Sequence, residues 1–273
     1  MSEFLPVGFG VLSWRGYESL AAALESYAAA DLFSLFAENV LFLPEAQPEG
    51  SALARRYGLK EISTPDNLGI LGGFKALAQA MASPILLLAE NDYPLIEPRE
   101  EAARQLRIAA DYLARGEAHV WRFRHRLRPG QGLDRLKSER YWPREGASAG
   151  RRLSAALLRI LRPGKAARLS GWTALTHENA ERLFPGEIRR TPEGDALVHS
   201  RSLPWCNNVF MVRRDFFLKT VIPAAEFDVR GRLVNGFPSI ETEINRRYWR
   251  RGDFWTGVGR GLFTHARREY RGY

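Results

Sequence analysis

Two carboxylates, Glu90 and Asp92, stand one residue apart directly after an unbroken apolar run over residues 85–89. The run is too short to cross a membrane and has the length of a strand that is buried on both faces. In open α/β sheets, ligands bind at the carboxyl ends of the strands, where an uncompensated acidic pair would be costly. The pair therefore predicts a divalent metal that holds a phosphate-bearing substrate. The competing interpretation is that both acids only cap the next turn.

The elements that would position this pair alternate between strand and helix patterns. Strand patterns occupy residues 7–12, 40–43, 61–64 and 85–89. Helix patterns occupy residues 17–30, 51–58, 74–81 and 100–115. This alternation predicts an α/β fold with a mostly parallel sheet and helices on both faces. The acidic pair would then lie at the carboxyl edge of that sheet.

The second half of the chain is more irregular. Residues 118–126 alternate in polarity and predict a strand that is half buried at most. From about residue 126 to residue 170, Arg and Lys crowd a basic insert that Pro-Gly pairs interrupt. A short amphipathic helix is predicted within this insert by Leu153, Leu157, Leu158 and Leu161. A last helix begins near Ser239 and ends at Gly252.

Length and composition limit the class of protein. With 273 residues, 45% of them hydrophobic, the chain can bury a sizeable core. The net charge of +9 favours nucleic acid, an anionic membrane surface or phosphorylated substrates as partners. The single cysteine, Cys206, excludes an internal disulfide and fits a reducing compartment. Because no apolar run approaches the roughly 20 residues of a transmembrane helix and the first residues lack the positive charge of a secretory signal, we expect a cytoplasmic protein.

Several short motifs follow one another in a characteristic order. They are Ser13, Glu45, Asn67-Leu68-Gly69, Glu90-Asn91-Asp92, Glu241-Thr242-Glu243, Arg246 or Arg247, Gly252 and His265. This order resembles the GT-A fold glycosyltransferases of the family 2 type, which transfer a sugar from a nucleotide sugar, usually with inversion. The resemblance implies a Rossmann-like GT-A sheet, with the basic insert as an acceptor lobe. Where the family usually has Asp-X-Asp and an Asp after the second strand, this chain has Glu90 and Glu45, which keep the carboxylate and lengthen it by one methylene.

The resemblance implies a donor site for a nucleotide sugar of the UDP, GDP or dTDP type. Its residues would be Ser13, Trp14, Glu45, Asn67, Gly69, Glu90, Asn91 and Asp92. A Mn²⁺ or Mg²⁺ ion bound by carboxylate oxygens can offset the charge that builds on the departing diphosphate. Asp92 would hold this ion, with His265 as a second ligand, since imidazole suits Mn²⁺. Taken alone, His265 reads equally well as a packed or surface residue.

A general base is implied at the start of the last helix. In an inverting transfer, a carboxylate takes the proton from the acceptor hydroxyl as its oxygen attacks the anomeric carbon. Glu241 occupies the family's position, and the helix N-terminus would stabilise its anion. Glu243 faces another side of the helix and remains the alternative base. A simple capping role is the competing interpretation for Glu241.

The acceptor would be a glycan or a lipid-linked molecule, as in cell-surface polysaccharide or glycolipid synthesis. Trp205, Asn207 and Asn208 are candidates to line its site, because they place a polar pair beside an aromatic that looks exposed. The basic insert has three interpretations. It binds an anionic acceptor, it lies on an anionic membrane through its leucine-rich helix, or it is a solvated surface. The membrane interpretation would put the protein at the inner face of the membrane.

We expect one domain in three segments and weigh two rival functions. Residues 1–116 would bind the nucleotide sugar, residues 117–234 would form the acceptor side, and residues 235–273 would carry the base and the metal histidine. A nucleotidyltransferase also uses an acidic metal site on an α/β sheet, but no Gly-rich Arg/Lys loop is found near the N-terminus. A nucleic-acid-binding protein would fit the pI of about 10.0, but the basic residues cluster in an insert and not in a recognised nucleic-acid module.

Overall fold

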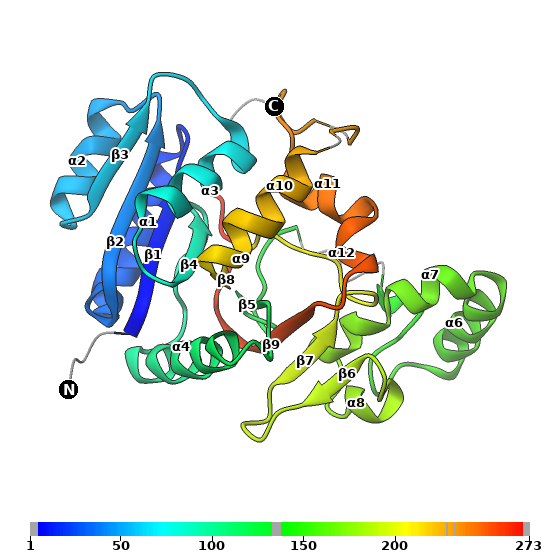
Figure 1. Ribbon diagram of the computed structural model, residues 1–273. Helices are drawn as coiled ribbons and strands as arrows, with labels where there is room; N and C mark the ends of the chain where they lie inside the picture. The colour runs from blue at the N-terminus through cyan, green and yellow to red at the C-terminus, as the bar shows by residue number, and fades with distance from the viewer. Residues whose placement is uncertain (1–4, 133–137, 228, 232, 270–273) are drawn as a thin grey trace.

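The structure, a computed structural model, describes residues 5–132, 138–227, 229–231 and 233–269. Within these residues, nine strands form one sheet in the order β3-β2-β1-β4-β8-β5-β9-β7-β6 (Figure 1). Its first part consists of β1 (Leu5–Leu12), β2 (Phe36–Pro44), β3 (Lys60–Thr64) and β4 (Ile85–Glu90). These four strands pair in parallel, as the alternation predicted.

The chain reverses its direction of travel across the sheet at β1. It runs from β1 to β2 and β3 on one side and then returns to β4 on the other side of β1. The carboxyl ends of β1 and β4 therefore flank a topological switch point, which is where open α/β sheets bind their ligands. Residues 85–89 of β4 are all buried, because helices cover both faces of the sheet.

The second part of the sheet is largely antiparallel. It consists of β8 (Phe210–Arg213), β5 (Val120–Arg124), β9 (Trp255–Phe263), β7 (Ala196–His199) and β6 (Ile188–Arg190). Of the pairs that involve these strands, only β5 with β9 is parallel. The prediction that β5 is half buried at most is wrong, since all five of its residues are buried. Trp121 and Phe123 enter the core on one face, and the guanidinium groups of Arg122 and Arg124 on the other face bond to backbone carbonyls.

Helices pack on both faces of the sheet, as expected. One face carries α1 (Tyr17–Ala29), η1 (Leu32–Leu35), α2 (Pro48–Arg56) and α4 (Arg99–Ala114). The other face carries α3 (Gly69–Ala80), η3 (Phe217–Val221), α10 (Ile222–Glu226), α11 (Ile240–Arg246) and α12 (Tyr248–Arg251), with the short α9 (Arg214–Phe216) leading into η3. The helix predicted at 74–81 thus begins earlier, and the predicted last helix is split. Its break lies at Arg247, whose φ of −145° is outside the helical region.

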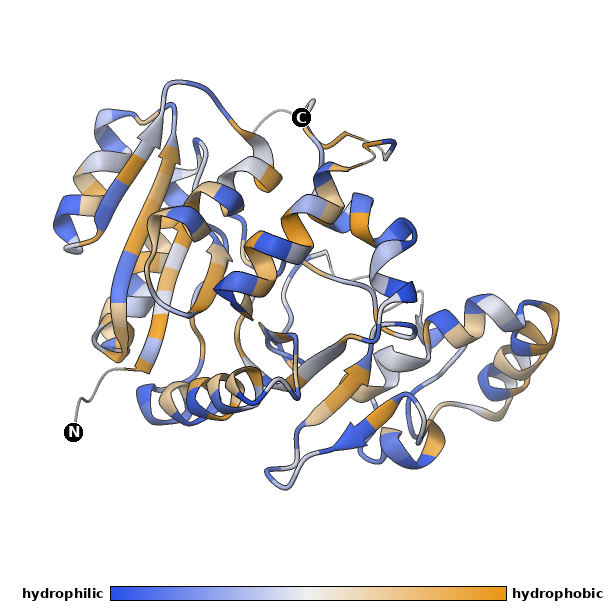
Figure 2. Ribbon diagram, in the orientation of Figure 1, coloured by the Kyte–Doolittle hydropathy of each residue, from blue (hydrophilic) through white to orange (hydrophobic). Residues whose placement is uncertain are grey.

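The basic insert contributes to a lobe that extends away from the parallel strands (Figure 1). This lobe contains α6 (Ala149–Leu161), α7 (Pro163–Arg168), η2 (Ser170–Leu175) and α8 (Ala180–Leu183). Residues 133–137 of the insert lie outside the described residues. A separate small core includes Trp172, Ile188 and Leu203. Apolar residues follow the central strands and also run along the exposed helix α6 (Figure 2). None of the helices described here is long and apolar enough to cross a membrane.

Candidate functional site

The loops after β1 and β2 meet at the carboxyl edge of the sheet. The indole N–H of Trp14 donates to Oε2 of Glu45 at 2.7 Å, and Arg15 pairs with the same oxygen at 3.2 Å. The backbone N–H of Ser13 donates to Phe42, which continues the pairing of β1 with β2 by one residue. The acid predicted after the second strand is therefore held beside the loop that follows the first.

A pocket of about 210 Å³ opens at this edge, and we call it the edge pocket. Its lining residues are Leu12, Trp14, Asn67, Gly69, Ile70, Glu90, Asn91, Val234, Asn235, Phe237 and Arg267. Five of the eight predicted donor residues are among them. Gly69 has a φ of +65°, and a Cβ there would lie 2.4 Å from the Cβ of Phe237. This glycine therefore lets the loop before α11 close over the start of α3.

Asp92 is the buried charge of the site, with 1% of its surface exposed. Its Oδ2 accepts from Nε2 of His265 at 3.1 Å and from Nε of Arg267 at 3.1 Å, while Oδ1 is buried without a hydrogen-bond partner. Burial raises the pKa of Asp92, but the hydrogen bond and charge of His265, together with Arg267, outweigh burial and hold the pKa below its usual value. The carboxylate is therefore ionised, with one oxygen left for a further ligand.

His265 is oriented by three contacts in addition to Asp92. Its Nδ1 lies 2.8 Å from the carbonyl oxygen of Gln131, so this nitrogen carries a proton and Nε2 faces Asp92. Its ring stacks on Tyr93 with the centroids 5.0 Å apart. Gly130, at a φ of +72°, lies so close that a Cβ there would be 2.1 Å from the carbonyl oxygen of His265. Metal-binding histidines commonly donate their second N–H to a carbonyl in this way.

The two predicted metal ligands are thus brought together, and their chemistry can be compared with what a metal needs. Among the described residues there is no group of three or more His, Cys, Asp or Glu that could hold an ion by itself. Mg²⁺ and related ions are often bound by one or two protein carboxylates plus the phosphates of a substrate. Oδ1 of Asp92, which has no partner, fits such a partial site. Nε2 of His265 would join it only after losing the proton that it donates to Oδ2, and a diphosphate would complete the ligand set.

Arg267 is a site residue that sequence analysis did not identify. It lines the edge pocket and pairs with Asp92. The sequence offers one signal for it: Arg267 lies two residues after His265, and alternate residues of an extended segment point the same way. This signal is weak, because several other arginines lie in the same stretch and nothing in the sequence distinguishes Arg267 from them.

The two candidate bases on α11 face different surroundings. Glu241 accepts from the backbone N–H of Asn207 and from the thiol of Cys206. Burial and the nearby Glu241 raise the pKa of this thiol to about 12, which keeps the proton on the sulfur beside Glu241. Glu243 points elsewhere, is 6% exposed, and accepts from the backbone N–H of Gly231 at 2.9 Å.

A continuous set of contacts joins the surroundings of Glu241 to those of Asp92. The side chain of Asn208 contacts Cys206 through its amide nitrogen and accepts from the Tyr93 hydroxyl through its oxygen. Arg124 donates to the same oxygen at 3.2 Å, and Tyr93 stacks on His265. The carboxylate at the end of β4 and the carboxylate on α11 therefore belong to one polar network.

The interpretation of Trp205 as an exposed aromatic is wrong. Its side chain is 2% exposed, its indole N–H donates to Asn207 at 2.9 Å, and its ring packs against Phe210 and Trp249. Asn207 is likewise buried, with 4% exposed. Of the three predicted acceptor residues, Asn208 is the one that lines a described pocket, a small space of about 30 Å³.

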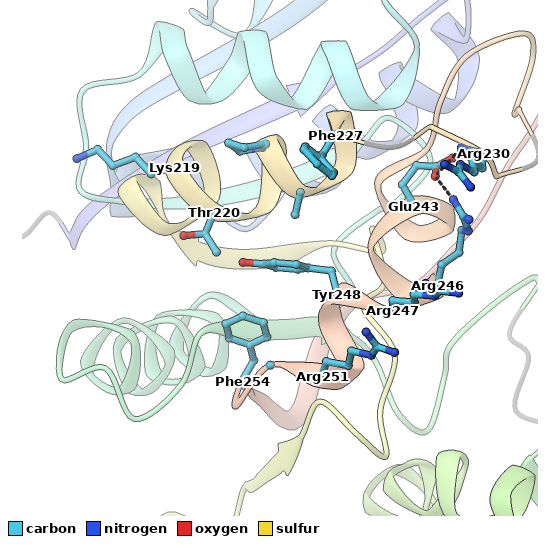
Figure 3. A pocket seen from close by; sticks show the side chains of 13 residues that line it. Lys219, Thr220, Phe227, Arg230, Glu243, Arg246, Arg247, Tyr248, Arg251 and Phe254 are labelled. Atoms are coloured by element: carbon cyan, nitrogen blue, oxygen red, sulfur yellow. Dashed lines mark hydrogen bonds and ion pairs between the residues drawn. The ribbon is translucent and has the colours of Figure 1, made fainter.

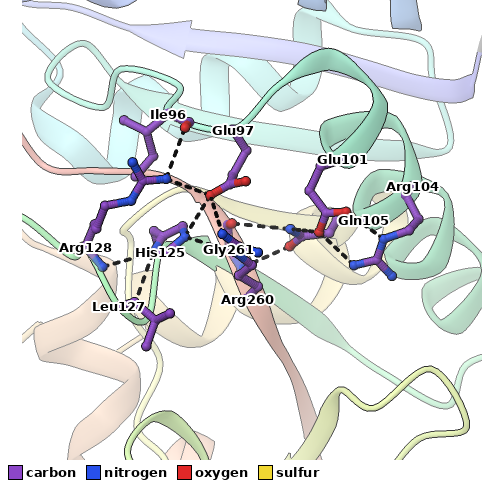
Figure 4. Close-up of polar contacts among 10 residues, drawn as sticks. All are labelled: Ile96, Glu97, Glu101, Arg104, Gln105, His125, Leu127, Arg128, Arg260 and Gly261. Atoms are coloured by element: carbon purple, nitrogen blue, oxygen red, sulfur yellow. Dashed lines mark hydrogen bonds and ion pairs between the residues drawn. The ribbon is translucent and has the colours of Figure 1, made fainter.

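A second polar cluster joins the segment before α4 to the end of β5 and to β9 (Figure 4). Glu97 is buried and accepts from Nε2 of His125 at 3.0 Å, while Arg128 and Arg260 pair with the same carboxylate. Nδ1 of His125 accepts two backbone N–H groups, and burial lowers the pKa of His125. A neutral His125 therefore ties the end of β5 to the loop that contains Pro129, whose carbonyl accepts from His265.

Comparisons with known proteins agree with this architecture. The chain matches no protein-family model and no curated protein sequence. Residues 1–349 of S. aureus TarS in complex with UDP-GlcNAc superpose with a TM-score of 0.52 at 11% identity, covering 98% of this chain and 60% of that one. A longer S. aureus TarS structure has a TM-score of 0.52 at 10% identity and covers 96% of this chain and 37% of that one. The structure of glucosyl-3-phosphoglycerate synthase from Mycobacterium tuberculosis, in complex with Mn²⁺, UDP and glucosyl-3-phosphoglycerate, has a TM-score of 0.49 at 12% identity. It covers 96% of this chain and 72% of that one.

The chain therefore has the GT-A fold, and the predicted fold class is confirmed. It spans about 60% of the length of the S. aureus TarS fragment.

The position of His265 can be tested through Gly130. Gly130→Ala should cost more folding stability than Gly58→Ala, measured by urea unfolding. Both glycines have a positive φ, and a non-glycine residue there costs about 1–2 kcal/mol. A Cβ on Gly58 meets nothing within 4 Å, whereas a Cβ on Gly130 would collide with the backbone of His265. Equal losses in the two variants would contradict this close packing.

Proposed function

We propose that this protein is a glycosyltransferase that moves a sugar from a nucleotide-sugar donor to an acceptor hydroxyl with inversion. The observation that carries the proposal is the polar network that joins Asp92, at the switch point of the sheet, to Glu241 on α11. The two carboxylates have different surroundings. Asp92 is buried between His265 and Arg267, whereas Glu241 is partly exposed at the start of a helix. Such a difference suits a reaction in which one carboxylate helps to bind the leaving group and the other takes the proton from the nucleophile.

The donor would occupy the edge pocket. Trp14 and the loop of Asn67 and Gly69 would contact the nucleotide base, and Glu45 and Glu90 the ribose hydroxyls. The solved complex of S. aureus TarS contains UDP-GlcNAc, which makes UDP donors the first to test, ahead of GDP and dTDP donors.

The diphosphate would lie where Asp92, His265 and Arg267 meet. A Mn²⁺ or Mg²⁺ ion held by Asp92 and His265 would act there as a Lewis acid on the diphosphate. Arg267 offers a fixed positive charge and a planar pair of donors for phosphate oxygens. Its ion pair with Asp92 keeps it aimed at this position before the donor binds.

Glu241 would act as the general base. Its carboxylate takes the proton from the acceptor hydroxyl, whose oxygen forms a bond to the anomeric carbon on the side opposite the diphosphate. The bond between that carbon and the diphosphate oxygen breaks, and the electron pair leaves with the diphosphate. The N–H of Asn207 and the thiol of Cys206 hold the carboxylate in place.

The acceptor would be a glycan or a lipid-linked molecule, and helix α6 supports a site of action at a membrane surface. Four large apolar side chains on this helix are more than half exposed: Leu153, Leu157, Ile160 and Leu161. They recur at helical spacing and form one stripe. Arginines flank the stripe at 151, 152, 159 and 162. An apolar stripe with basic flanks suits the interface of an anionic membrane.

The role of Asp92 predicts metal-dependent binding of a nucleotide. One of UDP, GDP and dTDP should raise the melting temperature more with Mn²⁺ than without it, and a ligand at about 100 times its Kd adds roughly 2.7 kcal/mol. Asp92→Asn should remain folded and lose this metal-dependent part, while Asp66→Asn, an exposed acid near the edge pocket, should keep it. The proposal would be falsified if none of the three nucleotides shifted the melting temperature.

The base can be identified by a matched pair of variants. Glu241→Gln should lower the rate of sugar transfer by about 10²–10⁴-fold and leave nucleotide binding unchanged, because the amide keeps the shape but cannot take a proton. Glu243→Gln, two residues along the same helix, should retain transfer. Transfer lost in Glu243→Gln and kept in Glu241→Gln would reassign the base to Glu243.

Membrane contact can be measured by co-sedimentation with lipid vesicles. The protein should bind vesicles that contain phosphatidylglycerol and not vesicles of phosphatidylcholine alone, with binding that weakens as salt rises. Ile160→Asp should abolish this binding, because it places a charge in the apolar stripe. Leu183→Asp alters an equally apolar and 56% exposed side chain on α8 and should leave binding intact. Equal binding by both variants would rule out α6 as the contact.

A further inference from the structure

A second pocket, of about 770 Å³, lies beside α10, α11 and α12 (Figure 3). We call it the helix pocket. Its walls come from η3 and α10, from the segment that includes Phe227 and Arg230, and from α11 and α12. None of its described lining residues is shared with the edge pocket. It is therefore a separate space on the same side of the sheet.

Positive charge dominates this pocket. The charged residues that line it are Lys219, Arg230, Glu243, Arg246, Arg247 and Arg251, five cations against one carboxylate. Glu243 is already engaged by the backbone N–H of Gly231 and by Arg246. In the part of the chain that the structure describes, no carboxylate pairs with Arg247 or Arg251. A concave surface of this kind attracts anions.

Two of these arginines are placed for joint binding by the break in the last helix. The backbone of Arg247 leaves the helical region, and α12 begins at the next residue. The N–H of Arg251 donates to the carbonyl of Arg247 at 3.2 Å, so the two residues stand one turn apart. Guanidinium groups bind phosphate oxygens through two parallel hydrogen bonds. The pair therefore suits a phosphate or two neighbouring phosphates.

Aromatic side chains line the pocket beside the cations. Phe227 is 91% exposed and Tyr248 is 41% exposed, and Tyr248 lies against Phe254 with ring centroids 5.8 Å apart. Figure 3 shows Tyr248 and Phe254 together on one side of the space. Aromatic faces pack well against the C–H faces of sugar rings. A simple inorganic anion has no such apolar face, so the aromatic residues favour a ligand that contains a sugar. A pocket of this volume also matches a ligand larger than one phosphate.

We propose that the helix pocket binds a phosphate-bearing glycan and that this glycan is the acceptor. The second half of this statement rests on the proposed glycosyltransferase function. The link between the two sites is α11, which presents Glu243 to the helix pocket and Glu241 to the polar network. A glycan held in the pocket is anchored by the same helix that carries the base. Arg247 and Arg251 hold the phosphate groups, and Tyr248 packs on a sugar ring.

Binding is measured by calorimetry with phosphorylated dextran, with unmodified dextran of the same length and with inorganic phosphate. Phosphorylated dextran should bind most tightly. The double variant Arg247→Gln/Arg251→Gln should weaken it by about tenfold or more. Arg55→Gln/Arg56→Gln, which removes the same charge from the exposed end of α2, should bind it normally. Tyr248→Ala should lose affinity for phosphorylated dextran and not for inorganic phosphate.

Equal losses in the two double variants would reduce the effect to net charge and overturn the inference. Binding of single-stranded RNA that is tighter than that of phosphorylated dextran, and equally sensitive to Arg247 and Arg251, would overturn it in favour of a nucleic-acid site. The acceptor role is tested separately, because the thermal shift with nucleotides and Mn²⁺ does not depend on this pocket. If a nucleotide raises the melting temperature but the glycan does not bind, the inference alone is wrong. If the glycan binds but no nucleotide raises the melting temperature, the transferase function is wrong, and so is the acceptor role.

Discussion

The buried charge of Asp92 is the constraint on which the site depends. A carboxylate that is 1% exposed stays ionised only where cations or hydrogen-bond donors replace water. His265 and Arg267 supply them, and both belong to the segment that follows β9. Removing one partner of a buried ion pair typically costs about 3–5 kcal/mol. Because the charge of Asp92 must be compensated, the last described segment of the chain is held against the end of β4. The N–H of Ala266 in this segment also donates to the carbonyl of Asp92.

Once this segment is fixed, the remaining polar groups follow from the order of the strands. β8, β5 and β9 succeed β4 in the sheet. Asn208 lies just before β8, Arg124 ends β5 and His265 follows β9, so the three side chains collect around Tyr93. This arrangement requires Arg124 to be buried, which its bond to the carbonyl of Pro129 makes tolerable. The contacts that bury Arg124 therefore belong to the same network that holds Tyr93 and His265 in place.

Helix α11 separates two kinds of chemistry. Its first turn carries two acids, and because residues two apart face different sides of a helix, Glu241 meets Cys206 while Glu243 meets the N–H groups of a neighbouring loop. The break at Arg247 then redirects the chain, so that Tyr248 and Arg251 also face the helix pocket. One short segment thus directs Glu241 toward Cys206 and positive charge toward the helix pocket.

The sequence by itself determined the features that depend on local patterns. The length of the apolar run at 85–89, the acidic pair beside it and the alternation of strands with helices can be read from spacing alone, and the parallel half of the sheet agrees with them. Only the tertiary structure decided that β5 is buried, that Trp205 is a core residue, that Arg267 joins Asp92 and that Glu241 and Glu243 have separate partners. The reason is that periodicity reports which side chains share a face of an element, whereas burial and charge pairing depend on what covers that face. For Asp92, the covering residue Arg267 lies 175 positions away, beyond the reach of any local pattern.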